Sequence, residues 1–171
     1  MRRLRWLIPG CVLLILSACP YTSDQPMSDP AAAMLDRSLV GTWKTQDKES
    51  KEWQSLTFLA WDDRQMVAIA NGGPNEKVEA YRIFVTTIEL EHFLNLQQLG
   101  EDENRPWNFA RYSIRDGRMY LSLVDDALFA SRSFDSPEAL RDFIGKNLAD
   151  PRLYARDDNE QPETAWEKVE K

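Results

Sequence analysis

The chain has 171 residues and a formal net charge of −7, with 43% hydrophobic and 29% charged residues, values typical of one globular domain and not of a disordered chain. The acidic balance argues against a nucleic-acid partner, because phosphate contacts require clustered lysine and arginine side chains. The two cysteines, Cys11 and Cys19, both lie near the N-terminus, so the rest of the sequence has no disulfide, thiol nucleophile or cysteine-based metal site.

Residues 1–18 have the layout of an export signal. Three arginines within residues 2–5 precede an apolar run over residues 6–16, which is shorter than the roughly 20 residues that span a bilayer. Small residues follow, and Leu16-Ser17-Ala18-Cys19 resembles the lipobox of bacterial lipoprotein precursors. The resemblance implies cleavage between Ala18 and Cys19, and a lipid on Cys19 that attaches the protein to a membrane. In that family an aspartate after the cysteine favours the inner membrane, so Pro20 at this position implies the outer membrane.

Residues 19–38 are expected to form the lipidated tether and a short helical turn. Residues 20–29 are polar, contain two prolines and show no periodicity, which is typical of a flexible linker. Asp29, Pro30 and the alanines that follow provide an N-cap, a proline at the first helical position and good helix formers. This pattern predicts one or two helical turns directly before the folded domain.

Residues 39–171 are expected to form one all-β domain. Short apolar or alternating runs recur with turn signals between them, which is typical of a sandwich or a barrel. Asp116-Gly117 is the strongest hairpin signal, because this pair supplies the positive φ angles of a tight turn. A small antiparallel meander barrel is the preferred fold, and a generic antiparallel sheet or sandwich is the alternative. The runs cover residues 40–45, 53–61, 65–71, 78–85, 92–97, 107–114, 119–124, 128–133 and 166–169.

One helix is predicted before the last strand. Ser136 is a good N-cap, Pro137 suits the first helical position, and Asp150-Pro151 ends the segment. Between them, apolar residues recur at helical spacing, which predicts a helix packed on the barrel. The stripe consists of Ala139, Leu140, Phe143, Ile144 and Leu148.

The first strand opens with Leu39-Val40-Gly41-Thr42-Trp43, which resembles the Gly-X-Trp opening of lipocalins and related calycin barrels. Beyond this motif, the mature chain resembles small lipocalin-like bacterial lipoproteins. The resemblance implies that Gly41 allows tight packing at the closed end of the barrel and that the Trp43 indole plugs that end. It also implies a basic side chain from the last strand over the indole, and Lys168 is the candidate.

The sequence contains no recognisable catalytic, phosphate-binding or dinucleotide-binding motif, so we expect no enzyme and no cofactor. His92 is the single histidine and has no carboxylates at ligand spacing, so no metal site is expected. The acidic loop at residues 101–104 is interpreted as a solvated turn and not as a calcium site, because it lacks spaced ligands. Trp53 and Trp61 share a parity opposite to Leu56 and Phe58, so their indoles are expected to face outward or to rim an opening.

Two functions remain open from sequence. In the first, a lipid-anchored envelope protein binds a small apolar or amphipathic ligand inside its barrel. In the second, a barrel with a filled core serves as a non-catalytic interaction protein, for example as a subunit of an envelope complex or an inhibitor of a cationic hydrolase. The candidate ligand lining takes one parity of several strands: Leu56, Phe58, Leu94, Leu96, Tyr112, Ile114, Leu121 and Leu123.

Overall fold

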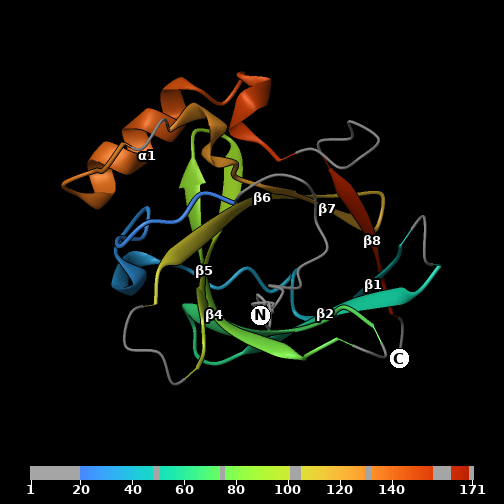
Figure 1. Cartoon of the computed structure of the whole chain (residues 1–171). Coiled ribbons are helices and arrows are strands. Elements are labelled where there is room, and N and C mark those ends of the chain that lie inside the picture. Colours follow the sequence, from blue (N-terminus) through green and yellow to red (C-terminus); the bar gives the residue numbers. More distant parts are fainter. Residues whose placement is uncertain are drawn as a thin grey trace, which may run out of the picture.

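A computed structural model describes residues 20–47, 51–73, 76–100, 105–129, 132–155 and 163–169. The described strands form a closed antiparallel barrel in which each strand pairs with the next in sequence and β8 pairs with β1 (Figure 1). This arrangement confirms the predicted all-β class and the meander barrel. The predicted signal peptide and its cleavage and lipidation residues, Ala18 and Cys19, lie outside the described residues.

The strands follow most of the predicted apolar runs. The β6–β7 hairpin turns at Asp116 and Gly117, whose φ angles are 51° and 75°, as the Asp-Gly signal predicted. The strands are β1 (Gly41–Gln46), β2 (Trp53–Ala60), β3 (Gln65–Asn71), β4 (Glu79–Ile88), β5 (Glu91–Gln98), β6 (Trp107–Arg115), β7 (Arg118–Leu123) and β8 (Thr164–Lys168).

The strand predicted over residues 128–133 is wrong for the part of this run that the structure describes. The chain instead turns through the 3-10 helix η2 (Asp126–Leu128) directly after β7. The Asp125 side chain starts the turn by accepting a hydrogen bond from the Ala127 N–H at 2.7 Å. Phe129 is then buried outside the barrel. A side-chain cap thus diverts an apolar run that would otherwise continue the sheet.

The predicted helices are present at both sites. The Ser136 hydroxyl caps α1 (Pro137–Lys146) by accepting from the Ala139 N–H, and the Asp29 carboxylate caps the 3-10 helix η1 (Pro30–Ala32) in the same way. A third short helix, η3 (Pro151–Leu153), follows α1 and precedes β8. In Figure 1, α1 lies outside the ring of strands, beside β5 and β6.

Apolar side chains form two separate clusters, which we call the inner core and the outer core. The inner core fills the barrel from every strand and includes Trp43, Phe58 and Tyr112. The outer core covers the outward side of β4, β5 and β6, where Phe84, Phe93 and Phe109 are buried. Alternation along each strand sends one side chain to the inner core and the next to the opposite face.

The outer core includes the segment that the sequence predicted to be a flexible tether, so that prediction is wrong. Tyr21 and Met27 are buried. Ser23 and Trp107 exchange backbone hydrogen bonds of 3.0 and 2.7 Å, as paired strands do. The Met27 N–H donates to the buried Asn95 side chain at 2.8 Å. These contacts hold residues 20–33 on the domain. Between the buried Tyr21 and Met27, backbone groups of the polar segment form hydrogen bonds with β5 and β6.

Candidate binding site inside the barrel

Gly41, Trp43 and Lys168 come together at one end of the barrel. Trp43 is 1% exposed, and its indole N–H donates to the Leu39 carbonyl at 2.7 Å. The Lys168 ammonium lies 4.9 Å from the centre of the Trp43 ring, and it donates to the Ser38 carbonyl at 2.9 Å. Gly41 has a φ of +127°, and a Cβ there would lie 3.1 Å from the Lys168 Cε. A side chain at residue 41 would therefore require the lysine to shift by a few tenths of an ångström, and the positive φ would strain the backbone of any other residue.

The segment that leads into β1 covers this end, which we call the closed end (Figure 1). Leu39 is fully buried in the inner core, and the Leu35 N–H donates to the Asp63 carbonyl in the β2–β3 turn. The Tyr112 hydroxyl reaches out of the barrel to the Asp36 carboxylate at 2.8 Å. Hydrogen bonds with the β2–β3 turn, with β6 and with Lys168 of β8 therefore hold residues 35–39 across the opening.

The contact between Asp36 and Tyr112 changes the pKa of both side chains. Burial acts to raise the pKa of Asp36, but hydrogen bonds from Ser38 and Tyr112 outweigh it and the net pKa lies below the ordinary value. Burial raises the pKa of Tyr112, and the Asp36 carboxylate raises it further, so this hydroxyl remains a donor at neutral pH. The contact is therefore a charge-assisted hydrogen bond at the closed end.

The eight side chains predicted to line a ligand site all belong to the inner core. Phe58, Leu94, Tyr112 and Leu121 are buried, whereas Leu56, Leu96, Ile114 and Leu123 are partly exposed. Of the partly exposed residues, Leu56, Leu96 and Leu123 lie toward the far end, where β2 begins and β5 and β7 finish. Solvent therefore reaches apolar side chains inside the far half of the barrel.

Side-chain size varies along the inner core. Phe58, Met66 and Met119 are almost completely buried near the closed end, next to Trp43. Toward the far end, Ala70 and Ala110 occupy the inward positions that pair with Leu56 and Leu123. Large and small side chains are mixed along the barrel, because Tyr81 is also buried toward the far end and Ala68 pairs with Phe58. The inward positions beside Leu56 and Leu123 are nevertheless small, so an opening among these leucines is the place for a ligand to enter.

Trp166 carries an unused hydrogen-bond donor inside the barrel. The residue is 3% exposed, belongs to the inner core and pairs with Met119 in the sheet. Its indole Nε1 is buried and has no hydrogen-bond partner in the structure. An unsatisfied buried donor costs about 1–3 kcal/mol, so one in an otherwise apolar barrel marks a place for an acceptor. It lies two residues nearer the far end than Lys168, on the same face of β8.

Sequence reasoning placed Trp166 in the last strand but did not include it in the site. The signal was its parity with Lys168: if Lys168 reaches the plug from this strand, the residue two positions earlier faces the same side. Whether its N–H finds a partner depends on the side chains of other strands, which the sequence does not place.

One side of the far end is acidic. Burial raises the pKa of Glu76, and the neighbouring charges of Glu52, Asp47 and Glu79 raise it further. These residues lie on the β1–β2 and β3–β4 connections and on the adjoining ends of β2 and β4. A negative rim disfavours the approach of anionic ligands and favours neutral or cationic ones.

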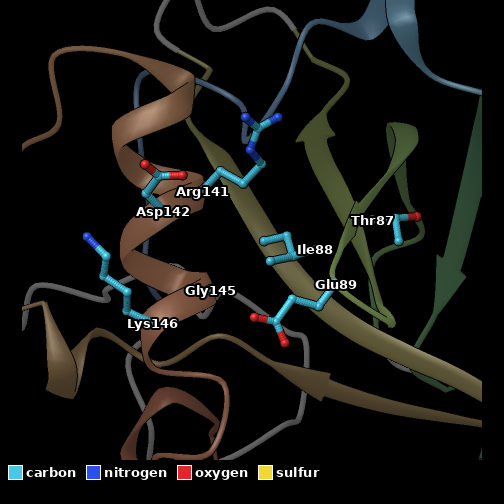
Figure 2. Close-up of a pocket in the computed structure, with 7 residues that line it drawn as sticks. All are labelled: Thr87, Ile88, Glu89, Arg141, Asp142, Gly145 and Lys146. Carbon is cyan, nitrogen blue, oxygen red and sulfur yellow. The ribbon is translucent and has the colours of Figure 1, made fainter.

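A separate groove of about 450 Å³ lies outside the barrel, between α1 and the β4–β5 turn (Figure 2). Gly145 brings the helix close to this turn, since a Cβ there would lie 3.2 Å from the Ile88 side chain. Figure 2 shows acidic and basic side chains around the groove, with Glu89 opposite a helix that carries Asp142 and Lys146. The mixed charges select no ligand class, so the groove is a feature of helix packing.

Other candidate features lie on the surface. His92 is exposed, its Nδ1 lies 3.1 Å from the Thr87 hydroxyl, and its ring packs near Tyr112. The described residues contain no group of three or more histidine, cysteine or carboxylate side chains arranged to hold a metal ion. Trp53, at the start of β2, and Trp61, directly after its end, are 58% and 66% exposed, in agreement with the outward position predicted for them. Within the described ranges, no helix has both the length and the apolar character needed to cross a bilayer.

No protein-family model, curated protein or solved structure matches this chain.

Proposed function

We propose that the chain is a lipid-anchored envelope protein whose barrel binds a small amphipathic ligand without catalysing a reaction. The observation that carries the binding proposal is the Trp166 indole N–H, which is buried in the inner core and has no acceptor. A ligand that enters from the far end would place its apolar part among Leu56, Leu96 and Leu123 and an acceptor atom at Trp166. Apolar walls with few polar groups are typical of small-molecule sites.

The charges of the far end narrow the ligand class. Asp47, Glu52, Glu76 and Glu79 surround one side of the entrance. Among the described strands, the lysine or arginine at an inward position is Lys168 at the closed end. A carboxylate ligand would pass the acidic rim and lose its hydration without gaining a counterion. The proposed ligand therefore has a neutral acceptor, such as a hydroxyl, ester or amide oxygen.

The binding test uses the mature chain from Pro20, because the barrel and both cores lie within residues 20–169. Nile red, a neutral apolar dye, is titrated and then displaced with 1-dodecanol or with dodecanoate. We expect saturable dye binding and displacement by dodecanol at lower concentration than by dodecanoate. Leu121→Trp should fill the interior and abolish dye binding while the domain stays folded.

Trp166→Phe isolates the hydrogen bond from the apolar pocket. It should weaken dodecanol binding about tenfold, which is the ~1.4 kcal/mol expected for one buried hydrogen bond, and leave dye binding nearly unchanged. Trp53→Phe is the matched control, because this indole is exposed on the outside of β2 and should not affect either ligand. Equal dodecanol affinities in wild type and Trp166→Phe would disprove the role of the indole.

The anchoring part of the proposal is supported by the basic start, the apolar run and the lipobox-like residues around Cys19. Stable attachment requires more than one acyl chain, which a diacylglyceryl group provides. In a Gram-negative host, wild-type protein should fractionate with the outer membrane and incorporate labelled palmitate. Cys19→Ser should remain unprocessed and unlabelled. Normal processing of this variant would overturn the anchoring proposal.

The apolar outer side of β2 favours interaction with another protein as the second candidate function. Trp53, Leu59 and Trp61 are 58%, 49% and 66% exposed on this face, and exposed apolar groups are common at interaction sites. If the folded mature chain binds neither Nile red nor dodecanol, the inner core acts only as structure and this second function becomes the better proposal.

A further inference from the structure

We infer that the far end of the barrel, the ligand entrance in the proposed function, faces the lipid bilayer. The inference rests on the proposed lipid anchor at Cys19 and adds an orientation that the anchor alone does not specify. Its partner is a lipid surface, and its consequence is that the barrel exchanges amphipathic molecules directly with the membrane. The observations that carry it are the fixed position of Pro20 and the distance of that position from the closed end.

The chain is held firmly from the residue that follows the anchor. Pro20 forms a β-bridge with Asp125, and the Tyr21 N–H donates to the Val124 carbonyl at 2.9 Å. The Tyr21 carbonyl accepts from the Asn108 side chain at 3.2 Å. The Tyr21 ring stacks on Phe129 with 3.6 Å between ring centres. A flexible spacer between the lipid and the domain is therefore absent from the residues after Cys19.

These contacts place Pro20 at the rim of the far end. Val124 and Asp125 directly follow the last residue of β7, and Trp107, which pairs with Ser23, is the first residue of β6. Both positions belong to the far end, whereas the β6–β7 hairpin at Asp116 and Gly117 belongs to the closed end. The lipid anchor is therefore attached beside the entrance and not beside the plug.

The length of the barrel determines how far the closed end lies from a membrane that holds the Pro20 rim. Adjacent Cα atoms are about 3.8 Å apart, so a lipid on Cys19 keeps the Pro20 rim at the headgroups. β6 has nine residues. At about 3.4 Å per residue and the usual strand tilt, the closed end lies roughly 20–25 Å from the rim along the barrel axis. An upright barrel thus holds its plug well away from the membrane.

Charge sets the tilt of the entrance. In a ring of eight strands, β2 and β3 lie opposite β6 and β7, so Glu52 and Glu76 lie across the entrance from Pro20. Zwitterionic headgroups tolerate this acidic side, whereas anionic headgroups repel it. The anchored side also carries acidic groups, Asp125 and Asp126, but the lipid holds it close to the membrane. The opposite side has no anchor, so it should rise when anionic lipid is added.

The test uses the complete lipidated protein in phosphatidylcholine vesicles that contain a lipid with a quencher on its headgroup. No cysteine follows Cys19, so a single introduced cysteine can be labelled with a fluorophore. Ala127→Cys marks the anchored side of the far end, Lys77→Cys marks the acidic side, and Leu90→Cys marks the closed end; all three side chains are exposed. Each labelled chain starting at Pro20 without lipid is the matched control.

We expect the Ala127 label to be quenched at least threefold more than the Leu90 label, with the Lys77 label between them. Adding phosphatidylserine should reduce quenching at Lys77 and leave it unchanged at Ala127. Equal or stronger quenching at Leu90 in vesicle-bound protein would overturn the orientation while leaving the anchor intact. Failure of the lipidated chain to float with vesicles would instead overturn the proposed anchor, and the orientation with it.

Discussion

The inner and outer cores solve the same packing problem in different ways. The inner core takes inward residues from all eight strands, so each strand contributes through simple alternation. The outer core covers only β4 to β6 and combines α1 with residues 20–33 and with the chain after β7. The comparison shows that one sheet can have strands buried on one face beside strands buried on both.

Strands buried on one face and strands buried on both faces have different sequence patterns. In β2, Leu56 and Phe58 alternate with polar residues or with side chains that remain exposed. In β4, Ile83 and Phe84 are consecutive and both fully buried, one in each core. Adjacent buried apolar residues in a strand therefore indicate that something covers its outer face.

Removing the plug of the inner core should have the largest effect on stability. Trp43→Ala should lower the free energy of unfolding by about 3–5 kcal/mol, because it removes a large side chain that is 1% exposed and leaves a cavity in the inner core. Chemical denaturation followed by circular dichroism measures this change. Trp53→Ala, on the exposed side of β2, should shift it by less than about 0.5 kcal/mol. Equal losses for the two variants would contradict the placement of Trp43.

A matching deletion in the outer core should act more locally. Leu140 is fully buried where α1 meets the barrel, and Leu140→Ala should cost about 2–3 kcal/mol. Hydrogen exchange should show faster opening of residues 137–148 and unchanged protection in β1 to β3. If protection falls equally in all strands, the two cores unfold as one unit, which would contradict the prediction that the outer core opens separately.

Loss of the polar contact that attaches the N-terminal segment should have a smaller effect. The Asn95 side chain accepts from the Met27 N–H and donates to the Thr86 hydroxyl at 2.8 Å. Asn95→Ala leaves the buried Met27 N–H without an acceptor, which should cost about 1–3 kcal/mol. Limited proteolysis should then cut within residues 20–33 while the barrel remains intact. Resistance equal to that of wild type would show that apolar packing alone holds the segment.

The smallest effect concerns the pH dependence at the closed end. Because the folded-state pKa of Asp36 is lowered, the stability it contributes is present above its unfolded pKa and is lost as pH falls through the folded value. Asp36→Asn should therefore lose less than about 1 kcal/mol at pH 7 and show a smaller loss between pH 5 and 3 than wild type. Parallel pH profiles for both proteins would contradict this role.

Local signals in the sequence predicted much of the fold. Alternation located the strands, Asp116-Gly117 located a hairpin, and Ser136-Pro137 located the start of the helix. The parity of each strand also placed the proposed lining residues in one cluster, because a closed barrel leaves only one interior.

The sequence did not show which distant segments cover the sheet. Tyr21 and Met27 are two apolar residues in a polar, proline-containing stretch, so no periodic pattern reveals that they are buried. The apolar run after β7 suggested another strand, but its side chains pack on α1 instead. The unpartnered donor of Trp166 was equally hidden, because hydrogen-bond satisfaction depends on neighbours from other strands.

The pairing of β1 with β8 also sets the order of events when the chain is made. These strands are separated by more than a hundred residues of sequence, so the ring can close only after residues 164–168 have been synthesised. Contacts between such distant segments form slowly compared with local hairpins. An almost complete nascent chain would therefore still lack the β1–β8 pairing that closes the barrel. The barrel can therefore close only after the five residues of β8 have been added to the chain.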